Sequence, residues 1–345
     1  MKIFVIRIGF FFLFWTCSLN AKAPDSWGKT HYIWNLGLRQ ECDVGVDCEP
    51  NEYFSSSEFL YKKENYQRIK DGDIVWIRPP FLKPFYNDFI ENLDKEIVLV
   101  ICDGDESFPK NCGLSPTELE NLLASPYVLH VFTQNFDYKG PSKKVSPIPI
   151  GIDFHSVAFK GGYWGMTGSP AHQEQVLEKI LQTSCPTRNR KKRAFVDFQH
   201  SESMRASFAR YKEFGEDRAS IFEKIKNSGV VDSSSRYPRE ALWRKKSEYA
   251  FSISPWGNGL DCHRTWEDLV LGCIVIVKTS SLDPLYEGLP VVIVKDWDEI
   301  HEENLNKWFQ IYQDASENGN FREKLTHKYW MKKIVAKTKF INTFS

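Results

Sequence analysis

Short, fully apolar segments that end at polar or glycine-containing turns constrain the fold of this chain most strongly. Residues 97–101 form one such run, and residues 273–277 and 291–294 form two more. A strand is a continuous apolar run when both of its faces are buried, as in parallel sheets covered by helices. Stretches with helical spacing separate these runs. The sequence therefore predicts an α/β protein built from parallel sheets.

A chain of 345 residues is long enough for two domains. The apolar runs fall into two groups, which a loop-rich stretch with Gly161-Gly162 and a basic run over residues 187–193 separate. We expect two Rossmann-like, doubly wound domains that face each other across a cleft. The predicted divisions are 1–23, 24–187, 188–320 and a C-terminal helix in 321–345.

The elements expected in these domains follow from local patterns. Ser115, Pro116 and Glu118 form a capping-box pattern that starts a helix. The strands that we expect cover residues 74–77, 97–101, 127–132, 194–198, 249–255, 273–277 and 291–294, and residues 147–153 are expected to be extended.

The first 23 residues have the features of an export signal. Lys2 and Arg7 precede an apolar run over residues 8–17, and Ala21-Lys22-Ala23 fits a cleavage site. About ten apolar residues are too few to cross a bilayer comfortably. We expect a signal peptide or a short uncleaved anchor, and therefore a place in the secretory pathway or cell envelope. Membrane contact is expected only through this segment, if it is not cleaved.

Cysteine spacing agrees with export, because short loops bracketed by two cysteines can close as disulfides in an oxidising compartment. Cys273 lies in a buried-strand pattern and is expected to be a free core thiol. The alternative is a cytosolic protein in which all these cysteines are unpaired. The predicted pairs are Cys42 with Cys48, Cys102 with Cys112, and Cys185 with Cys262.

The charge balance bears on possible partners. The chain has 45 basic and 45 acidic residues, so its net charge is zero. This argues against a protein that holds nucleic acid through a broad basic surface. The basic run at 187–193 is either a solvated linker or a phosphate-facing patch.

The densest group of chemically useful residues lies between residues 254 and 267. A strand ends at Pro255, two glycines allow the backbone to approach a ligand, and Asp261 can cap the helix that follows. The N-terminus of a helix suits a diphosphate. Arg264 can fork onto phosphate oxygens, and Glu267, one turn further, suits ribose hydroxyls. The predicted donor-binding residues are Ser254, Gly257, Asn258, Gly259, His263, Arg264 and Glu267.

Residues 251–297 resemble the C-terminal half of exostosin-type glycosyltransferases, family 47 in the usual classification. The shared motifs are Ser254-Pro255-x-Gly257, Arg264-x-x-Glu267-x-Leu269-x-x-Gly272-Cys273-Ile274-x-Ile276-Val277, Leu289-Pro290 and Asp296-Trp297. More loosely, residues 133–135 and 148–155 look similar too. Val275 stands where members of the family often carry Pro.

The resemblance implies a GT-B fold, with an N-terminal acceptor domain and a C-terminal domain that holds the nucleotide-sugar donor. It also implies an inverting glycosyltransferase that uses a nucleotide-diphosphate donor such as a UDP-sugar. The acceptor would be a hydroxyl of a glycan or glycoconjugate, with no obligatory metal or other cofactor.

Inverting transfer needs a base to deprotonate the acceptor hydroxyl. The preferred candidates are Asp105 and Asp103, which follow a central strand, and the other candidates are His155 and its neighbour Asp153. Two alternatives stay open. Asp103 and Asp105 match the D-x-D pattern of metal-dependent GT-A transferases. The chain could also be a non-catalytic, GT-B-shaped partner that binds glycan.

Overall fold

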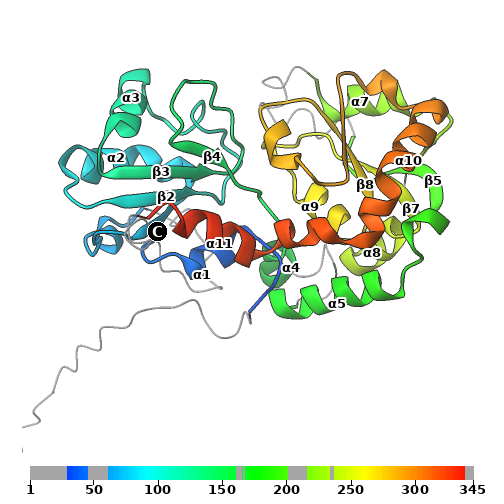
Figure 1. Ribbon diagram of the computed structural model, residues 1–345, viewed down its shortest axis with the longest axis horizontal. Helices are drawn as coiled ribbons and strands as arrows, with labels where there is room; N and C mark the ends of the chain where they lie inside the picture. Colours follow the sequence, from blue (N-terminus) through cyan, green and yellow to red (C-terminus); the bar gives the residue numbers. More distant parts are fainter. Residues whose placement is uncertain are drawn as a thin grey trace, which may run out of the picture.

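A computed structural model of the chain describes residues 29–45, 61–160, 165, 168–200, 216–233 and 237–338. Within these ranges the chain forms two α/β lobes that lie side by side (Figure 1). The predicted export signal at 1–23, Cys48 and the Gly161-Gly162 pair lie outside the described residues. No helix in the described part of the chain is both long and apolar enough to cross a membrane.

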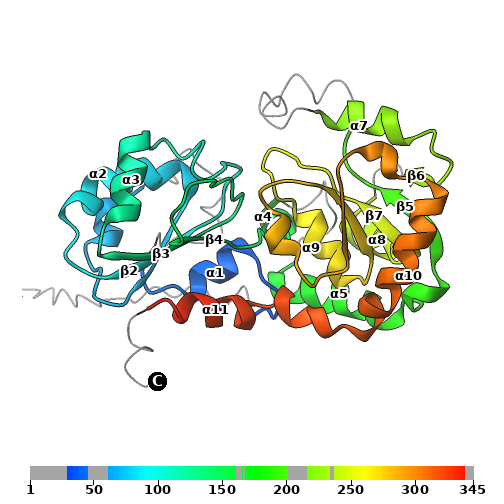
Figure 2. The ribbon, with the colours of Figure 1, turned by 45° about the horizontal axis from the view of Figure 1, so that its top comes forward.

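The first lobe is built on a four-stranded parallel sheet in the order β1-β2-β3-β4, which follows the sequence. The central strand β2 is fully buried, as its apolar run predicts. Helices α2 (Leu82–Phe89) and α3 (Pro116–Ala124) lie on one side of the sheet, and α1 (Asn35–Glu41) and α11 (His327–Val335) lie on the other (Figures 1 and 2). The strands are β1 (Ile74–Ile77), β2 (Ile97–Ile101), β3 (Val128–Thr133) and β4 (Val145–Pro147).

The predicted start of α3 is confirmed in detail. The Ser115 hydroxyl accepts the backbone N–H of Glu118, and the Glu118 carboxylate accepts the backbone N–H of Ser115. These two bonds satisfy donors that the first turn of a helix leaves open.

The second lobe is built on a five-stranded parallel sheet in the order β6-β5-β7-β8-β9. Helices α5 (Pro170–Thr183), α8 (Arg239–Lys246) and α9 (His263–Val270) share one hydrophobic core with the first lobe. Helices α7 (Arg218–Ile225) and α10 (Glu302–Asn318) pack on the other side of the sheet in a second core. The strands are β5 (Lys191–Val196), β6 (Val231–Ser233), β7 (Tyr249–Ile253), β8 (Ile274–Lys278) and β9 (Val291–Val294).

These two sheets confirm the predicted fold class, an α/β protein with two parallel-stranded lobes. In the second sheet the strand order reverses between β5 and β7. Ligands of open parallel sheets bind beyond the carboxyl ends of the strands at such a reversal. The ends of β5 and β7 are therefore the first place to look for a site.

The basic run at 187–193 is neither an open linker nor a free phosphate patch. Arg190 is buried and donates from its Nη2 to the carbonyl of Leu271 at 2.9 Å, at the C-terminal end of α9. A cation there complements the helix dipole. Three other members of the run pair with acids: Arg188 with Glu317, Lys191 with Glu248, and Arg193 with Asp232.

The expected disulfides Cys102–Cys112 and Cys185–Cys262 are corrected by the structure. Cys102, Cys185 and Cys262 are free thiols, and Cys42 is also free within the described residues. The sulfur of Cys102 instead accepts the indole N–H of Trp76 at 2.9 Å. Cys273 is a buried free thiol, as predicted.

A buried ion cluster joins α8 to β5 and α9. The Nζ of Lys246, which is 1% exposed, lies 2.7 Å from a carboxylate oxygen of Asp197 and 2.7 Å from one of Asp268. Burial would raise the pKa of Asp197, but Arg264 and Lys246 outweigh it and lower that pKa to about 2. Removal of the shared cation would leave two carboxylates buried together.

We therefore expect Lys246→Met to lower the free energy of unfolding by about 3–5 kcal/mol, because it breaks a buried ion cluster. The matched control is Lys245→Met, a neighbour whose ammonium is solvent-exposed and whose replacement should change stability little. Urea unfolding of both variants measures the difference. Equal losses in the two variants would contradict the account of the cluster.

Candidate active site

The carboxyl ends of the strands of both sheets meet where the two lobes touch, a region that we call the interlobe junction. After β3, the side-chain oxygen of Asn135 accepts the backbone N–H of Asp261 at 2.8 Å. After β8, the hydroxyl of Ser281 donates to the carbonyl of Phe136 at 2.7 Å. Polar groups from both lobes therefore surround one place.

The loop between β7 and α9, which the sequence predicts to bind a ligand, lies at this junction. The hydroxyls of Ser254 and Thr265 lie 2.8 Å apart, so Ser254 holds the loop to α9. A Cβ atom added at Gly259 would lie 2.7 Å from the Asn135 side chain of the first lobe. One added at Gly257 would lie 2.7 Å from the guanidinium of Arg218. Gly259 is needed because its neighbour is a buried amide, whereas at Gly257 the flexible end of Arg218 can move aside.

The helix after this loop begins later than expected. We expected Asp261 to cap it, but α9 begins at His263 with Cys262 as the N-cap. The Asp261 carboxylate instead accepts the backbone N–H of Ile150, at 2.8 Å, and the indole N–H of Trp266. Burial raises the pKa of Asp261 to about 6 even though these hydrogen bonds oppose the shift. Asp261 thus fastens α9 to the first lobe.

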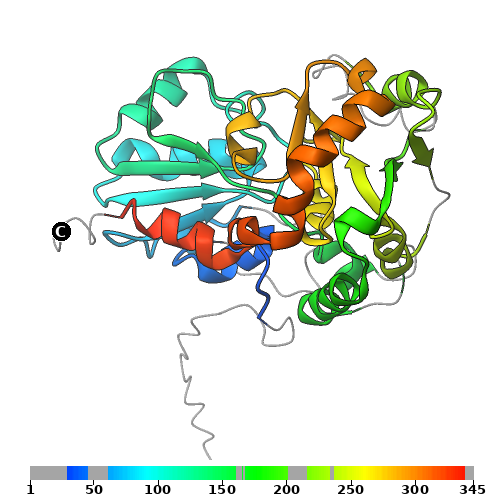
Figure 3. The same ribbon diagram turned by 45° about the vertical axis from the view of Figure 1, so that its right-hand side comes forward.

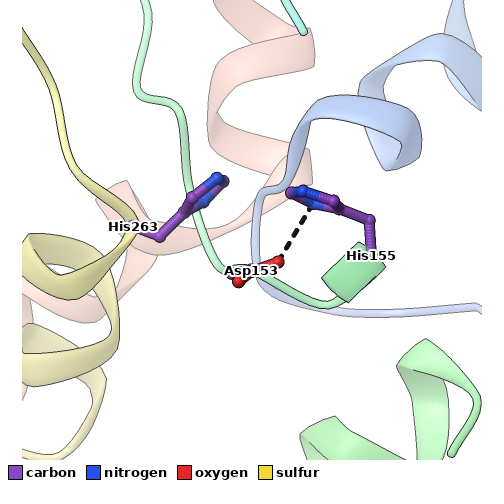
Figure 4. A group of neighbouring side chains, drawn as sticks. All are labelled: Asp153, His155 and His263. Carbon is purple, nitrogen blue, oxygen red and sulfur yellow. Dashed lines mark ion pairs between the residues drawn. The ribbon is translucent and has the colours of Figure 1, made fainter. Parts of the chain in front are cut away.

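Two imidazoles face each other at the junction (Figure 4). His263 is the first residue of α9, and its Nδ1 lies 2.7 Å from the carbonyl oxygen of Gly151. Because a carbonyl only accepts, Nδ1 carries the proton and Nε2 is left as an acceptor in the neutral ring. His155 is the first residue of α4 (His155–Lys160), and its ring centroid lies 5.3 Å from that of His263.

His155 is held by a carboxylate. Its Nδ1 lies 3.1 Å from Oδ1 of Asp153, which favours a proton on Nδ1 and leaves Nε2 as the acceptor. Burial lowers the pKa of His155 below its ordinary value, although Asp153 opposes the shift. The ring is therefore neutral near pH 7. An oriented neutral imidazole of this kind can accept a proton.

The buried Arg239 of α8 connects this carboxylate to α9. Its Nη2 lies 2.7 Å from Oδ2 of Asp153, and its Nη1 lies 2.7 Å from Oε1 of Glu267. Burial alone would raise the pKa of Asp153, but His155 and Arg239 outweigh it and hold that pKa well below its ordinary value. A series of charged contacts thus leads from Glu267 of the second lobe through Arg239 and Asp153 to the imidazole of His155.

The predicted donor-binding side chains differ in whether their polar atoms already have partners within the protein. Both carboxylate oxygens of Glu267 are engaged, one by Arg239 and the other by the indole N–H of Trp243 at 3.1 Å. Arg264 binds Asp197 through Nε, while its buried Nη1 has no hydrogen-bond partner among the described residues. Asn258 is half-buried in the loop.

Of the four candidate bases, Asp153 is the partner of His155, and the other three are exposed to different degrees and have different neighbours. Asp103 is 4% exposed, lies in the left-handed region with φ of 74°, and its Oδ2 is 3.0 Å from Nε of Arg78. Asp105 is exposed two residues later. Only His155 of the three is placed by described contacts beside α9.

Asp153, His155 and His263 place potential ligand atoms within 4.8 Å of one another, so they are the candidate metal group among the described residues. Two imidazoles and one carboxylate suit a transition metal. However, Arg239 already neutralises the Asp153 carboxylate. A second cation would meet that guanidinium and the positive N-terminal end of α9. The charges fit proton transfer and anion binding better than a divalent cation. Asp103 and Asp105 are not part of this group.

Three residues of the junction were missed by sequence reasoning. Arg239 lies in a helix that no motif marks, and Asn135 was noted only within residues 133–135 of the family resemblance. Arg218 is not among the predicted site residues, yet its Nε donates to the carbonyl of Trp256 at 2.8 Å. Its place at the start of α7, after the first strand of the second lobe, is the signal that could have identified it.

Comparison with known proteins gives a structural likeness only. No known protein family matches the sequence, and no curated protein does. A UDP-forming α,α-trehalose-phosphate synthase from Burkholderia xenovorans is 12% identical, with a TM-score of 0.41 over 81% of this chain and 77% of that one. The α,α-trehalose 6-phosphate synthase from Burkholderia multivorans is 11% identical, with a TM-score of 0.40 over 81% and 74%. The catalytic domain of starch synthase IV from Arabidopsis thaliana is 13% identical, with a TM-score of 0.29 over 85% and 77%.

The close approach of Gly259 to Asn135 can be tested by a double-mutant cycle. Gly259→Ala should lower the free energy of unfolding by about 1–3 kcal/mol, because the new methyl group overlaps the amide of Asn135. In the Asn135→Ala background the same change should cost clearly less, since the amide is gone. Urea unfolding of the four proteins gives the coupling energy. Purely additive losses would show that the two lobes do not meet at this point.

Proposed function

We propose that this chain is a glycosyltransferase that moves a sugar from a nucleoside-diphosphate donor, with UDP-sugars as first candidates, to a hydroxyl of a glycan or glycoconjugate. The observation that carries the proposal is the meeting of two parts at the interlobe junction. One is the β7–α9 turn of the second lobe, and the other is the imidazole of His155 beside Asp153.

The donor side of the proposal uses α9. The first backbone N–H groups of a helix, together with its dipole, favour a diphosphate. Arg218 lies beside the loop, and Arg264 has a buried N–H group without a partner, which a phosphate oxygen would satisfy. Both cations would stabilise the charge that develops on the leaving diphosphate. His263 Nε2 lies at the same end of α9 and would contact the donor.

Glu267 has a different role in this proposal from the ribose contact that the sequence predicts. Its two oxygens hold Arg239 and Trp243, so it acts as a positioning residue. Through Arg239 it fixes the carboxylate of Asp153 and hence the ring of His155.

On the acceptor side, Nε2 of His155 is the proposed base. As the acceptor oxygen forms its bond to the anomeric carbon, the bond from that carbon to the diphosphate oxygen breaks on the opposite side, which inverts the configuration. The proton of the acceptor hydroxyl passes to Nε2, and Asp153 stabilises the imidazolium that results. Asp105 is exposed and remains the alternative base.

The proposal needs no metal and no resident cofactor, because helix dipole, guanidinium and imidazole groups supply the charge stabilisation. It places the protein in the secretory pathway or cell envelope, on the basis of the export features in residues 1–23. Nucleic acid is not among the proposed partners, since the net charge is zero and the basic run is largely paired with acids.

The test measures nucleotide release from UDP-, GDP-, ADP- and CMP-sugars by the full chain, first without and then with candidate glycan acceptors. We expect one of the UDP-, GDP- or ADP-sugar classes to be turned over and the same class to raise the melting temperature, because it binds only the native form, whereas turnover of CMP-sugars alone would contradict a diphosphate leaving group. A chain that binds glycan but releases no nucleotide from any donor would be a non-catalytic glycan-binding protein, and the proposal would be wrong.

The role of His155 gives a sharper expectation. His155→Ala should lower kcat about 10²–10⁴-fold, as removal of a general base does. The control is His172→Ala, which changes an exposed histidine of α5. Because the pKa of His155 is lowered, the rate should fall on the acid side with a midpoint below pH ~6.5 and be level at neutral pH. Loss of activity in EDTA, restored by a divalent cation, would favour a metal at the Asp153–His155–His263 group instead.

A further inference from the structure

The outward side of α11 carries positive charge only. Residues 326–345 contain five lysines and neither aspartate nor glutamate. Four of these lysines fall in the described part of the chain and are exposed, and no ion pair joins any of them to a described carboxylate. The basic run at 187–193, in contrast, is largely paired with acids. The four residues, which we call the lysine face, are Lys328, Lys332 and Lys333 of α11 and Lys337, which lies two residues beyond its end.

The lysine face is fixed by how α11 packs. Trp330, Met331 and Ile334 are buried in the core of the first lobe. The lysines therefore point outward along the helix, which lies beside α1 below the sheet of the first lobe (Figures 1 and 3). The Nζ of Lys333 lies 4.8 Å from the ring centroid of Tyr329, so its charge is held close to the helix surface.

The start of the described chain lies next to α11. The backbone N–H of Ile33 donates to the carbonyl of Leu325 at 2.9 Å, and that of His327 donates to the carbonyl of His31 at 3.0 Å. The apolar run at residues 8–17 precedes this segment. Residues 18–28 span at most about 40 Å even when fully extended. An apolar run inserted in a membrane would thus hold the protein close enough for the lysine face to reach that membrane.

We propose that the lysine face of α11 binds anionic lipid headgroups of the membrane that receives the N-terminal apolar run. Lysines close to an anionic bilayer each add favourable electrostatic free energy, and a short apolar segment alone gives weak anchoring. The tether is what favours a membrane over an acidic polysaccharide or protein as the occupant. This inference does not depend on the proposed glycosyltransferase activity.

The test measures binding of the full chain to two kinds of vesicle by flotation. Neutral phosphatidylcholine vesicles report the contribution of the apolar run. Vesicles with about 30% phosphatidylserine report in addition any electrostatic contact. We expect the native chain to bind the anionic vesicles at least about tenfold more tightly, and about 0.5 M NaCl to remove that excess.

The variant Lys328→Glu/Lys332→Glu/Lys337→Glu should lose the preference for anionic vesicles and keep its affinity for neutral ones. These side chains are exposed, so the fold should be retained, which the melting temperature checks. The matched control is Lys179→Glu/Lys295→Glu/Lys307→Glu, which makes the same change in net charge at exposed positions of the second lobe.

Three results would overturn the proposal. The native chain could bind both kinds of vesicle equally well. The two triple variants could lose the preference to the same extent, which would make it an effect of net charge. The α11 variant could lose binding to soluble heparin while its vesicle binding stayed native, which would assign the lysine face to an acidic polymer.

Discussion

One buried cation fixes the geometry of the interlobe junction. The guanidinium of Arg239 is shared by Asp153, which belongs to the segment leaving the first lobe, and Glu267 of α9. Taking three charges out of water costs several kcal/mol, and close pairing offsets that cost only in a narrow range of geometries. The shared guanidinium therefore fixes where Asp153 lies relative to α9 more than it stabilises the folded protein. It is also why Asp153 stays ionised beside His155.

The apolar core also joins the second lobe to the first, over a larger area than the ion pairs do. Trp266 and Leu269 of α9 belong to a cluster that also contains strands β1 and β2 of the first lobe. Since protein cores are densely packed, α9 cannot shift far relative to the first sheet without loss of contacts. Asp261 adds a polar tie from the start of α9 to Ile150. The loop proposed to bind the donor and the imidazole proposed as base are thus parts of one rigid arrangement.

Much of the fold could be predicted from the sequence, because buried parallel strands leave a clear signal. The runs at 97–101 and 291–294 are strands where expected. Strand β6 was missed because Val231–Ser233 is a short edge strand in which only the valine is apolar. The pairing of Cys102 with Cys112 was expected from loop length alone, which takes no account of the Trp76 indole that contacts the Cys102 sulfur.

The candidate site could be predicted only where it is built from local features of the sequence. The end of β7 and the start of α9 are local features, so residues 254–263 pointed to the right edge of the sheet. The partners of those residues are not local. Arg239 meets Asp153 across 86 positions of the sequence, and nothing near either residue signals the pair. For the same reason the sequence could not show that the oxygens of Glu267 are already engaged.

The most direct measurement of the central claim is the protonation state of His155 in the folded chain. Nitrogen-15 NMR of histidine-labelled protein, with His155→Ala used to assign the signal, reports which ring nitrogen carries a proton. The account predicts a neutral ring at pH 7, with the proton on Nδ1 and none on Nε2. A doubly protonated ring, or a proton on Nε2, would contradict it, because His155 would then have no lone pair directed away from Asp153.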